Sequence, residues 1–385
     1  IRGEISEGMI CSEKELQLGE SHEGIMILDQ THSTGKKCSE IFDIYNDISI
    51  EIVLTPNRSD AISHWGVARD LKAWCIANNI DYRWKIPKVK EYDLGINSTF
   101  KLKVENFEMC PYYSGVIISN IKIKPSPKWM QNYLNTIGIT PKNNIVDITN
   151  YVMHELGQPL HAFDFSKIKD EIIVKTLPHG SEFITLDGEK RKLSSEDLMI
   201  CDKSKPLCIA GIYGGINSGI TEKTNEIFLE CAVFNPISIR KSSKRHGLST
   251  EASFRYERGI DSASVYYALC RAIDLILNLA GGKIDCDILK VERSKMDLKK
   301  INLRYNKIYS TIGVKIPESK INKILESLDI KIISKSKNEL NIEVPNYRHD
   351  VTREIDVIEE ILRIYGYNNI PSLNDFKTHY PEKSI

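Results

Sequence analysis

Apolar residues recur at two different spacings along this chain, and each spacing predicts a different kind of element. In 262–280 they fall every three or four positions, at Val265, Leu269 and Ala272 among others, which predicts a long amphipathic helix. Short apolar runs predict strands at 101–104, 113–119, 171–175 and 226–234. The chain is therefore expected to be an α+β protein with many short strands.

Changes in these patterns divide the chain into five segments. They are expected to be the end of a small β-barrel, a small α/β domain, a large α+β domain, a winged-helix-like domain and a linker, over 1–30, 31–95, 98–296, 298–372 and 373–385. The α/β domain is predicted from a strand at 48–54 and a helix with apolar positions at Ala61, Trp65, Ala68, Leu71 and Cys75. The winged-helix-like domain is predicted from the order helix, hairpin, helix.

Composition narrows the class of protein. The 385 residues hold 52 lysines and arginines against 52 aspartates and glutamates, so any contact with a polyanion must come from a local patch. The nine cysteines form no C-x-x-C pair, which favours free thiols in a reducing cytoplasm. No apolar run approaches the roughly 18 residues that a membrane helix needs. Because the chain begins without methionine, we expect it to be a piece of a longer protein.

The stretch 208–259 combines features that suit a binding site. It opens with a cluster of glycines that either let the backbone approach a ligand or only turn the chain, namely Gly211, Gly214, Gly215 and Gly219. Glu230 follows in a predicted strand, on the same face as Phe228 and Ala232. A carboxylate on an apolar face is costly without a partner, so we expect the protein or a ligand to supply a hydrogen bond to it.

Histidines and basic residues near this stretch offer further candidate chemistry. The spacing of His154, His161 and Asp164 is not that of a zinc site, and His161 is expected on a loop. A basic patch is formed by Arg240, Lys241, Lys244, Arg245, His246, Arg255 and Arg258. It is either a solvated helix face or a contact for a polyanion such as RNA.

Four carboxylates lie within eleven residues of one another: Asp350, Asp356, Glu359 and Glu360. A cluster of oxygen ligands suits magnesium, which binds through a few carboxylates and waters. Acidic residues are also favoured at the start of a helix, where they interact with its dipole. Both interpretations stay open at this point.

Several long motifs occur together in one order. They are I-R-G-E-I-S-E-G-M-I-C-S-E-K-E-L (1–16), N-I-V-D-I-T-N-Y-V-M-H-E-L-G-Q-P-L-H-A-F-D (144–164), L-E-C-A (229–232), R-H-G-L-S-T-E-A-S-F-R-Y-E-R-G (245–259) and Y-R-H-D...E-E-I-L-R-I-Y-G-Y-N-N-I-P (347–371). In this order the motifs resemble those of the β subunit of bacterial phenylalanine–tRNA ligases, over nearly the whole chain. The resemblance implies that 1–30 ends a tRNA-binding oligonucleotide fold.

The resemblance also implies an editing domain at 98–296, which hydrolyses tyrosine wrongly attached to the tRNA for phenylalanine. Tyrosine differs from phenylalanine by one hydroxyl group, so the pocket must recognise that group. Glu230 is expected to accept its hydrogen bond, and phenylalanine would leave the carboxylate unpaired at a loss of about 1–3 kcal/mol. Gly214 is expected to let the backbone approach the ring, and Ala252 to shape the floor.

His161, near the ester, and Thr250 are the residues expected to be catalytic. The chain shows neither the order of a Ser-His-Asp triad nor a G-x-S-x-G turn, which favours direct attack by water over a covalent intermediate. Three positions depart from the family pattern: Thr140 replaces an arginine, Ser249 a histidine and Glu251 an aspartate. The alternatives are an RNA-binding and assembly scaffold with an inactive editing pocket and, more remotely, a stand-alone metallohydrolase.

The resemblance further implies partners and cofactors. The chain is expected to assemble with an α subunit into a cytoplasmic α2β2 tetramer that binds the tRNA for phenylalanine, with ATP-dependent aminoacylation on the α subunit and no membrane contact. The carboxylates Asp350, Asp356, Glu359 and Glu360 correspond to positions that bind Mg²⁺ in this family, at the contact with α.

Overall fold

The computed structural model describes residues 3, 5, 7–16, 18, 19, 21–42, 45–293 and 298–371. Contacts within the chain divide it into two compact units, Ile1–Ser49 and Ile50–Ile385. In the first unit, the described residues form one short helix, α1 (Cys38–Ile41), and no strand. The barrel end expected in 1–30 is therefore not confirmed, and the linker predicted at 373–385 lies outside the described residues.

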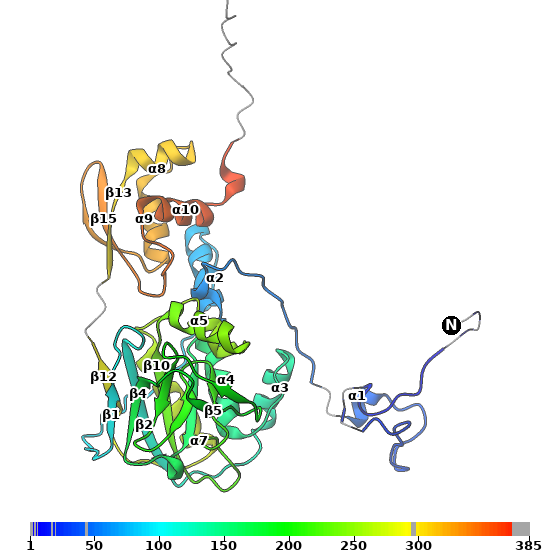
Figure 1. The fold of residues 1–385 in the computed structure, drawn as a ribbon. Coiled ribbons are helices and arrows are strands. Elements are labelled where there is room, and N and C mark those ends of the chain that lie inside the picture. Colours follow the sequence, from blue (N-terminus) through cyan, green and yellow to red (C-terminus); the bar gives the residue numbers. More distant parts are fainter. Residues whose placement is uncertain are drawn as a thin grey trace, which may run out of the picture. The chain divides into compact units, whose positions relative to one another are not determined.

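Two five-stranded sheets form the large domain of the second unit (Figure 1). The first has the order β1 (Lys101–Val104), β4 (Glu171–Thr176), β7 (Leu198–Cys201), β8 (Pro206–Ile209) and β9 (Tyr213–Gly214). The second has the order β11 (Lys283–Ile284), β2 (Tyr112–Ser119), β10 (Glu226–Val233) and β3 (Leu160–Asp164), with β12 (Leu289–Glu292) also paired to β2. A separate hairpin joins β5 (Glu182–Ile184) to β6 (Lys190–Lys192).

Helices cover the second sheet and fix the ends of its strands. The long helix predicted at 262–280 is present as α7 (Val265–Leu279), which packs on β10 and on α4 (Asn144–Leu156). Gly157 ends α4 in the left-handed conformation, with φ of 83°, and the chain then enters β3. The remaining helices of this domain are α3 (Lys128–Thr136), α5 (Pro236–His246) and α6 (Glu251–Tyr256), with a 3-10 turn η2 (Phe165–Lys167).

The C-terminal domain is built around a three-stranded sheet. Its sheet order is β13 (Lys299–Arg304), β15 (Glu339–Val344) and β14 (Lys331–Lys335), and its helices are α8 (Tyr305–Ile312), α9 (Glu318–Ser327) and α10 (Glu354–Tyr365), followed by η3 (Tyr367–Asn369). The predicted order of helix, hairpin and helix is present in α9, β14, β15 and α10. Its assignment as a winged-helix-like domain stays a prediction.

The segment predicted as a small α/β domain is organised differently. The strand expected at 48–54 is not formed, and these residues are mostly exposed. After a 3-10 turn, η1 (Ser59–Ala61), the predicted helix is present as α2 (His64–Asn78). It lies against α9 and α10, and Ala73 and Ala77 are buried in the core of the C-terminal domain (Figure 1).

Membrane insertion through a helix has no support in the fold. Within 45–293, 298–371 and the described part of the first unit, no helix is long and apolar enough to cross a bilayer.

Candidate functional site

Glu230 lies in the middle of β10, between two neighbouring strands. β10 pairs antiparallel with β2 and with β3, which places Gly115 and His161 directly opposite Glu230. Residues opposite one another in antiparallel strands point to the same face of the sheet. The carboxyl group and the imidazole that the sequence singled out are therefore brought together, on strand β3 rather than on the loop expected for His161.

Burial controls the protonation of Glu230. Its side chain is 4% exposed, and Oε2 has no hydrogen-bond partner in the protein. Burial raises the pKa of Glu230 to about 8, and the nearby hydroxyl of Tyr113 opposes this rise. At neutral pH the carboxyl group is therefore mostly protonated, and it becomes a stronger hydrogen-bond acceptor as the pH rises.

His161 is also a buried polar group without a partner. No atom of the protein bonds its Nε2, and burial lowers the pKa of His161 to about 4. The ring stands edge-on to Phe163, with 4.4 Å between ring centroids. The imidazole is uncharged at neutral pH and free to exchange a hydrogen bond with a ligand or a water molecule.

A cavity of about 80 Å³ lies over these two residues, with Leu160, Cys208, Gly214 and Ala252 also in its lining. This volume is well below the roughly 300–1,000 Å³ of ordinary ligand pockets, so it suits one side chain rather than a whole aminoacyl ester. A Cβ atom on Gly214 would lie 2.9 Å from Leu186 Cδ1 and 3.5 Å from His161 Cε1. The backbone at Gly214 is thus tightly packed against the cavity wall, and its predicted approach to a bound ring stays a prediction.

Thr250 lies at the start of α6, next to this cavity. As the helix N-cap, its Oγ1 accepts a hydrogen bond from Ser253 N at 3.1 Å and donates one to Ile212 O at 3.1 Å. The contact ties α6 to Ile212, a residue of the cavity wall. The structure thus gives Thr250 a structural contact, and a catalytic role for it stays a prediction.

Sequence reasoning missed two buried polar residues beside Glu230. Tyr113 on β2 is fully buried, and its Oη has no hydrogen-bond partner. Gln158, 1% exposed, donates from Nε2 to Pro159 O and Ala232 O, both at 3.1 Å, while its Oε1 has no partner. Alternation within 113–119 could place Tyr113 on one face of its strand. Only the pairing of β2 with β10 shows that Glu230 lies on the same face of the sheet.

The three positions that depart from the family pattern lie outside the lining of the cavity. Thr140 and Ser249 are exposed. Glu251 is bound to Arg255 through an ion pair of 2.7 Å. Their influence on a ligand in the cavity is therefore indirect.

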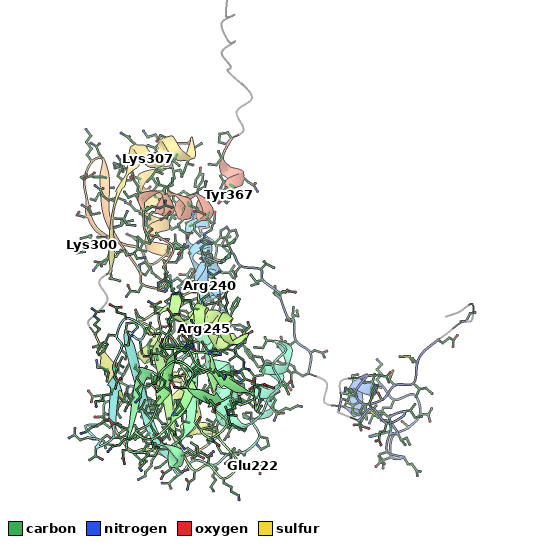
Figure 2. The ribbon with its side chains drawn as sticks, viewed as in Figure 1. Glu222, Arg240, Arg245, Lys300, Lys307 and Tyr367 are labelled. Atoms are coloured by element: carbon green, nitrogen blue, oxygen red, sulfur yellow. The ribbon has the colours of Figure 1, made fainter. Side chains whose placement is uncertain are left out.

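The basic patch on α5 is partly neutralised. Figure 2 labels Arg240 and Arg245 of this patch, of which Arg240 is exposed. Arg245 and His246 bind the buried carboxylate of Asp197. Burial would raise the pKa of Asp197, but hydrogen bonds from Ser242, the Ser194 backbone and His246 lower it overall. The surface left for a polyanion is smaller than the sequence suggested.

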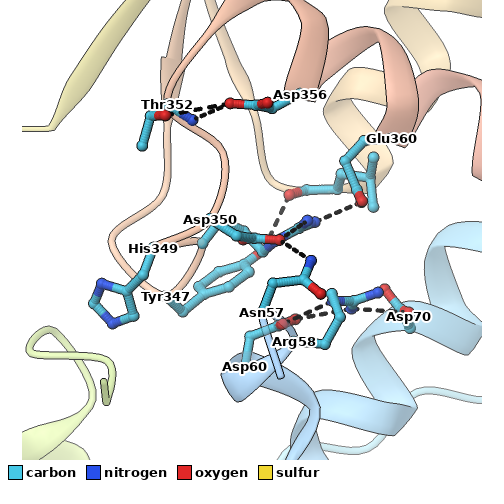
Figure 3. A network of polar contacts seen from close by, with 12 residues as sticks. Asn57, Arg58, Asp60, Asp70, Tyr347, His349, Asp350, Thr352, Asp356 and Glu360 are labelled. Atoms are coloured by element: carbon cyan, nitrogen blue, oxygen red, sulfur yellow. Dashed lines mark hydrogen bonds and ion pairs between the residues drawn. The ribbon is translucent and has the colours of Figure 1, made fainter. Parts of the chain in front are cut away.

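Three of the four C-terminal carboxylates, Asp350, Asp356 and Glu360 (Figure 3), are paired with arginines. Arg348, 3% exposed, holds Asp350 with two hydrogen bonds of 3.0 Å and also donates to the buried Glu360. Burial opposes ionisation, yet Arg348 and Arg363 lower the pKa of Glu360 to about 2. Asp356 instead accepts from the backbone of Thr352 and Arg353 at the start of α10.

A magnesium ion does not fit between these side chains as the structure places them. The guanidinium group of Arg348 already supplies the positive charge between Asp350 and Glu360, and Glu359 is exposed on α10. Across the described part of the chain, no three His, Cys, Asp or Glu side chains are placed to hold one metal ion.

The same ion pairs join the C-terminal domain to the segment that contains α2. Asn57 Nδ2 donates to Asp350 Oδ2 at 3.0 Å (Figure 3). Arg363 binds Asp70 at 2.9 Å. Arg58 reaches Asp70 from the other side at 3.0 Å. This ion-pair network, Arg58, Asp60, Asp70, Arg348, Asp350, Glu360 and Arg363, attaches α2 to the C-terminal domain, while α2 also packs on α4 of the large domain.

Comparison with known proteins shows which protein families the chain resembles. Two family models match, one described as a B3/4 domain over residues 109–281 and one as a tRNA synthetase B5 domain over residues 301–367. A solved N-terminal fragment of the phenylalanyl-tRNA synthetase β subunit from Pyrococcus horikoshii aligns at 18% identity and a TM-score of 0.41, covering 81% of this chain and 85% of that one.

Curated relatives match over essentially the whole chain. The phenylalanine–tRNA ligase β subunits of Bacteroides fragilis strain YCH46 and of Desulfotalea psychrophila are 46% and 41% identical over 389 residues, covering 100% of this chain and 47% of each relative. That of Bacteroides thetaiotaomicron is 48% identical over 376 residues, covering 96% of this chain and 45% of its own length. The chain belongs to the β-subunit family of the phenylalanine–tRNA ligases and spans about half the length of these curated relatives.

Proposed function

We propose that this chain is part of the β subunit of a cytoplasmic phenylalanine–tRNA ligase, which joins L-phenylalanine to tRNA(Phe) with ATP as an α2β2 tetramer. In this proposal the chain contributes to assembly and tRNA binding, and its large domain hydrolyses Tyr-tRNA(Phe). Membership of the family supports the first part. The geometry around Glu230 supports the second.

The observation that carries the editing proposal is the unpaired carboxyl group of Glu230 in a cavity sized for one side chain. A tyrosine ring in this cavity would donate its phenolic hydrogen bond to Glu230. A phenylalanine ring would leave the buried group unpaired, which costs on the order of 1–3 kcal/mol. The cavity would therefore favour the incorrect aminoacyl group, as an editing site must.

The chemistry assigned to this site is ester hydrolysis by water. The water oxygen attacks the carbonyl carbon of the ester, the bond to the terminal ribose oxygen of the tRNA breaks, and tyrosine and tRNA are released. A ring nitrogen of the uncharged His161 would accept a hydrogen bond from the attacking water. Gly214 and Ala252 would shape the cavity around the ring, leaving room that larger side chains would fill.

The test uses the complete holoenzyme with purified Tyr-tRNA(Phe) and Phe-tRNA(Phe). Hydrolysis of the tyrosyl ester is expected to exceed both the buffer rate and the phenylalanyl rate, and Glu230→Ala is expected to remove this preference. Aminoacylation with phenylalanine serves as the control for assembly and should persist in the variant. Hydrolysis of Tyr-tRNA(Phe) at the buffer rate would argue against editing by this chain.

A scaffold with an inactive pocket is the second candidate. The observation that favours it is that Thr250, one of the two expected catalytic residues, has its hydroxyl engaged in capping α6. In that case Glu230→Ala would leave the discrimination between the two esters unchanged, while substitutions in the exposed basic residues of α5 would still weaken tRNA binding.

Magnesium and ATP enter the proposal only as ligands of the holoenzyme in the aminoacylation reaction on the α subunit. No step in this chain is assigned to a metal ion, because Arg348 fills the position between Asp350 and Glu360.

A further inference from the structure

Tyr113 and Glu230 lie on the same face of the sheet, two residue pairs apart along the ladder. The register of β2 and β10 places Tyr113 opposite Ala232 and Gly115 opposite Glu230. Side chains two residues apart on a strand point the same way, and diagonal neighbours across a strand pair lie within reach of long side chains. The phenol of Tyr113 and the carboxyl group of Glu230 are thus diagonal neighbours.

Both groups are buried with an unused hydrogen bond. Tyr113 Oη and Glu230 Oε2 have no partner, and the structure shows no hydrogen bond between them. The hydroxyl nevertheless lies close enough to favour the ionised form of Glu230, and it lowers the pKa of that carboxyl group against the larger effect of burial. Two buried polar atoms left unpaired side by side are uncommon in a folded protein and call for a function.

The other titratable groups around Glu230 carry no charge at neutral pH. His161 faces it from β3, and Cys208 of β8 and Tyr256 of α6 line the same cavity, while Cys110 and Cys231 lie close enough for the charge of Glu230 to affect them. Burial keeps all of them uncharged at neutral pH by raising the pKa of the thiols and the phenol and lowering that of the imidazole. None of the described residues that line the cavity is a lysine or an arginine.

We propose that Tyr113 is a positioning residue for Glu230, donating a hydrogen bond to one carboxylate oxygen while the other accepts the phenolic hydrogen bond of a bound tyrosine side chain. The proposal rests on the proposed function, since it takes the cavity to be a tyrosine site. A carboxylate has acceptor positions for both donors. With one oxygen held by Tyr113, the other keeps a fixed direction toward the ligand.

Tyr113→Phe separates this role from a structural one. The substitution keeps the ring and its packing and removes only a hydroxyl that has no partner in the structure. A purely structural residue would then lose nothing, because an unpaired buried hydroxyl does not stabilise the fold. A positioning residue would leave Glu230 harder to ionise.

The first experiment titrates Glu230 in this chain by infrared difference spectroscopy of its protonated carboxyl group, with Glu230→Gln as the blank. In Tyr113→Phe the midpoint is expected to rise by about half a pH unit or more, since a donor to the charged form has been removed. The matched control is Tyr92→Phe, which removes a buried phenol that donates to Asp274 instead. An unchanged or lower midpoint in Tyr113→Phe would overturn the proposal.

The second experiment measures kcat/KM for Tyr-tRNA(Phe) hydrolysis by the holoenzyme across the same pH range. Activity is expected to rise with pH as Glu230 ionises, and Tyr113→Phe should shift this rise to higher pH. An unshifted profile would contradict the positioning role. If the wild-type holoenzyme hydrolyses no Tyr-tRNA(Phe), the proposed function fails, while the infrared titration still decides whether Tyr113 controls Glu230.

Discussion

Glu230 has a protonation state that its surroundings set, and this links the site to the stability of the fold. Burial raises the pKa of Glu230 from 4.5 to about 8 in the folded protein, while in the unfolded chain it returns to its ordinary value. The folded state therefore holds a proton that the unfolded state releases. The stability contributed by this proton is complete below about pH 4.5 and is lost as the pH rises to about 8.

Replacing Glu230 with glutamine tests this directly. Between pH 5 and pH 8 the wild-type chain should lose more free energy of unfolding than Glu230→Gln, by on the order of a few kcal/mol. Urea unfolding at the two pH values measures the difference. Because His154 and His161 are present in both proteins, their own titration cancels. An equal loss of free energy of unfolding in both proteins would mean that burial does not raise the pKa of Glu230.

At the residue scale the sequence predicted the face of the strand on which Glu230 lies, but not the residues around it. Alternation within 226–234 was enough to put Glu230 on one face with Phe228 and Ala232. Tyr113 was out of reach because its contact with Glu230 depends on the register between β2 and β10, which are far apart in the chain. Register is a long-range property that a single strand's pattern does not contain.

The glycine-rich segment acts as one wall of the cavity, and only some of its glycines are needed for that. Gly214 in β9 lies where any side chain would press on Leu186 and approach His161. At Gly219 an added Cβ would meet only Leu186 Cδ2, at an ordinary 3.5 Å. The two positions therefore differ in what a methyl group would displace.

Gly214→Ala is expected to lower hydrolysis of Tyr-tRNA(Phe) by about 10- to 100-fold, since small displacements in a positioned site are costly. Gly219→Ala, the matched control, should leave the rate within about a factor of two. Single-turnover hydrolysis by the holoenzyme measures both. Equal rates in the two variants would argue against a role for Gly214 in shaping the cavity.

Helix α10 owes much of its attachment to Arg348. Removing this side chain leaves Glu360, which is 4% exposed, with only Arg363 as its cation. Arg348→Met is expected to lower the free energy of unfolding by about 3 kcal/mol or more, because a buried carboxylate loses a partner. Arg353→Met, at a side chain 73% exposed, should cost less than about 1 kcal/mol. Denaturant unfolding of the two variants decides between a buried ion pair and a surface one.

Two predictions, the strand at 48–54 and the buried face of α2, differ from the structure in which side chains are buried. The pattern at 48–54 is that of a strand, but the structure gives it no partner strand and leaves it mostly exposed. In α2, Leu71 was predicted on the apolar face and is 60% exposed, whereas the small Ala73 and Ala77 are buried against the C-terminal domain. Small residues permit close helix packing that an apolar scale does not reveal.

The molecule as a whole balances its C-terminal carboxylates with arginines. If Arg348 and Arg363 provide the positive charge, the stability of this chain should not depend on divalent cations. Its Tm is expected to be the same in excess EDTA and in excess Mg²⁺ at equal ionic strength. Differential scanning calorimetry makes the comparison, with Arg348→Met as the variant in which freed carboxylates could respond to the ion. A fall in the wild-type Tm on chelation would support the metal site that the family resemblance implied.

The motifs that suggested the domain order are long and local, whereas no local pattern indicated the contact of α2 with the C-terminal domain. That contact depends on Asn57 and Asp70, which meet side chains 293 positions later in the sequence. Nothing in a local pattern indicates such a partner.

The central position of β10 in its sheet makes this strand resistant to local opening. Its residues 227–231 are bonded to strands on both sides, so this segment can open only by breaking two ladders at once. Amide hydrogens there should be among the last in the protein to exchange with solvent. A recognition group carried on such a strand keeps its shape through thermal fluctuation. If the cavity edits Tyr-tRNA(Phe) as we propose, a correct phenylalanyl ester would be spared at every moment, not only on average.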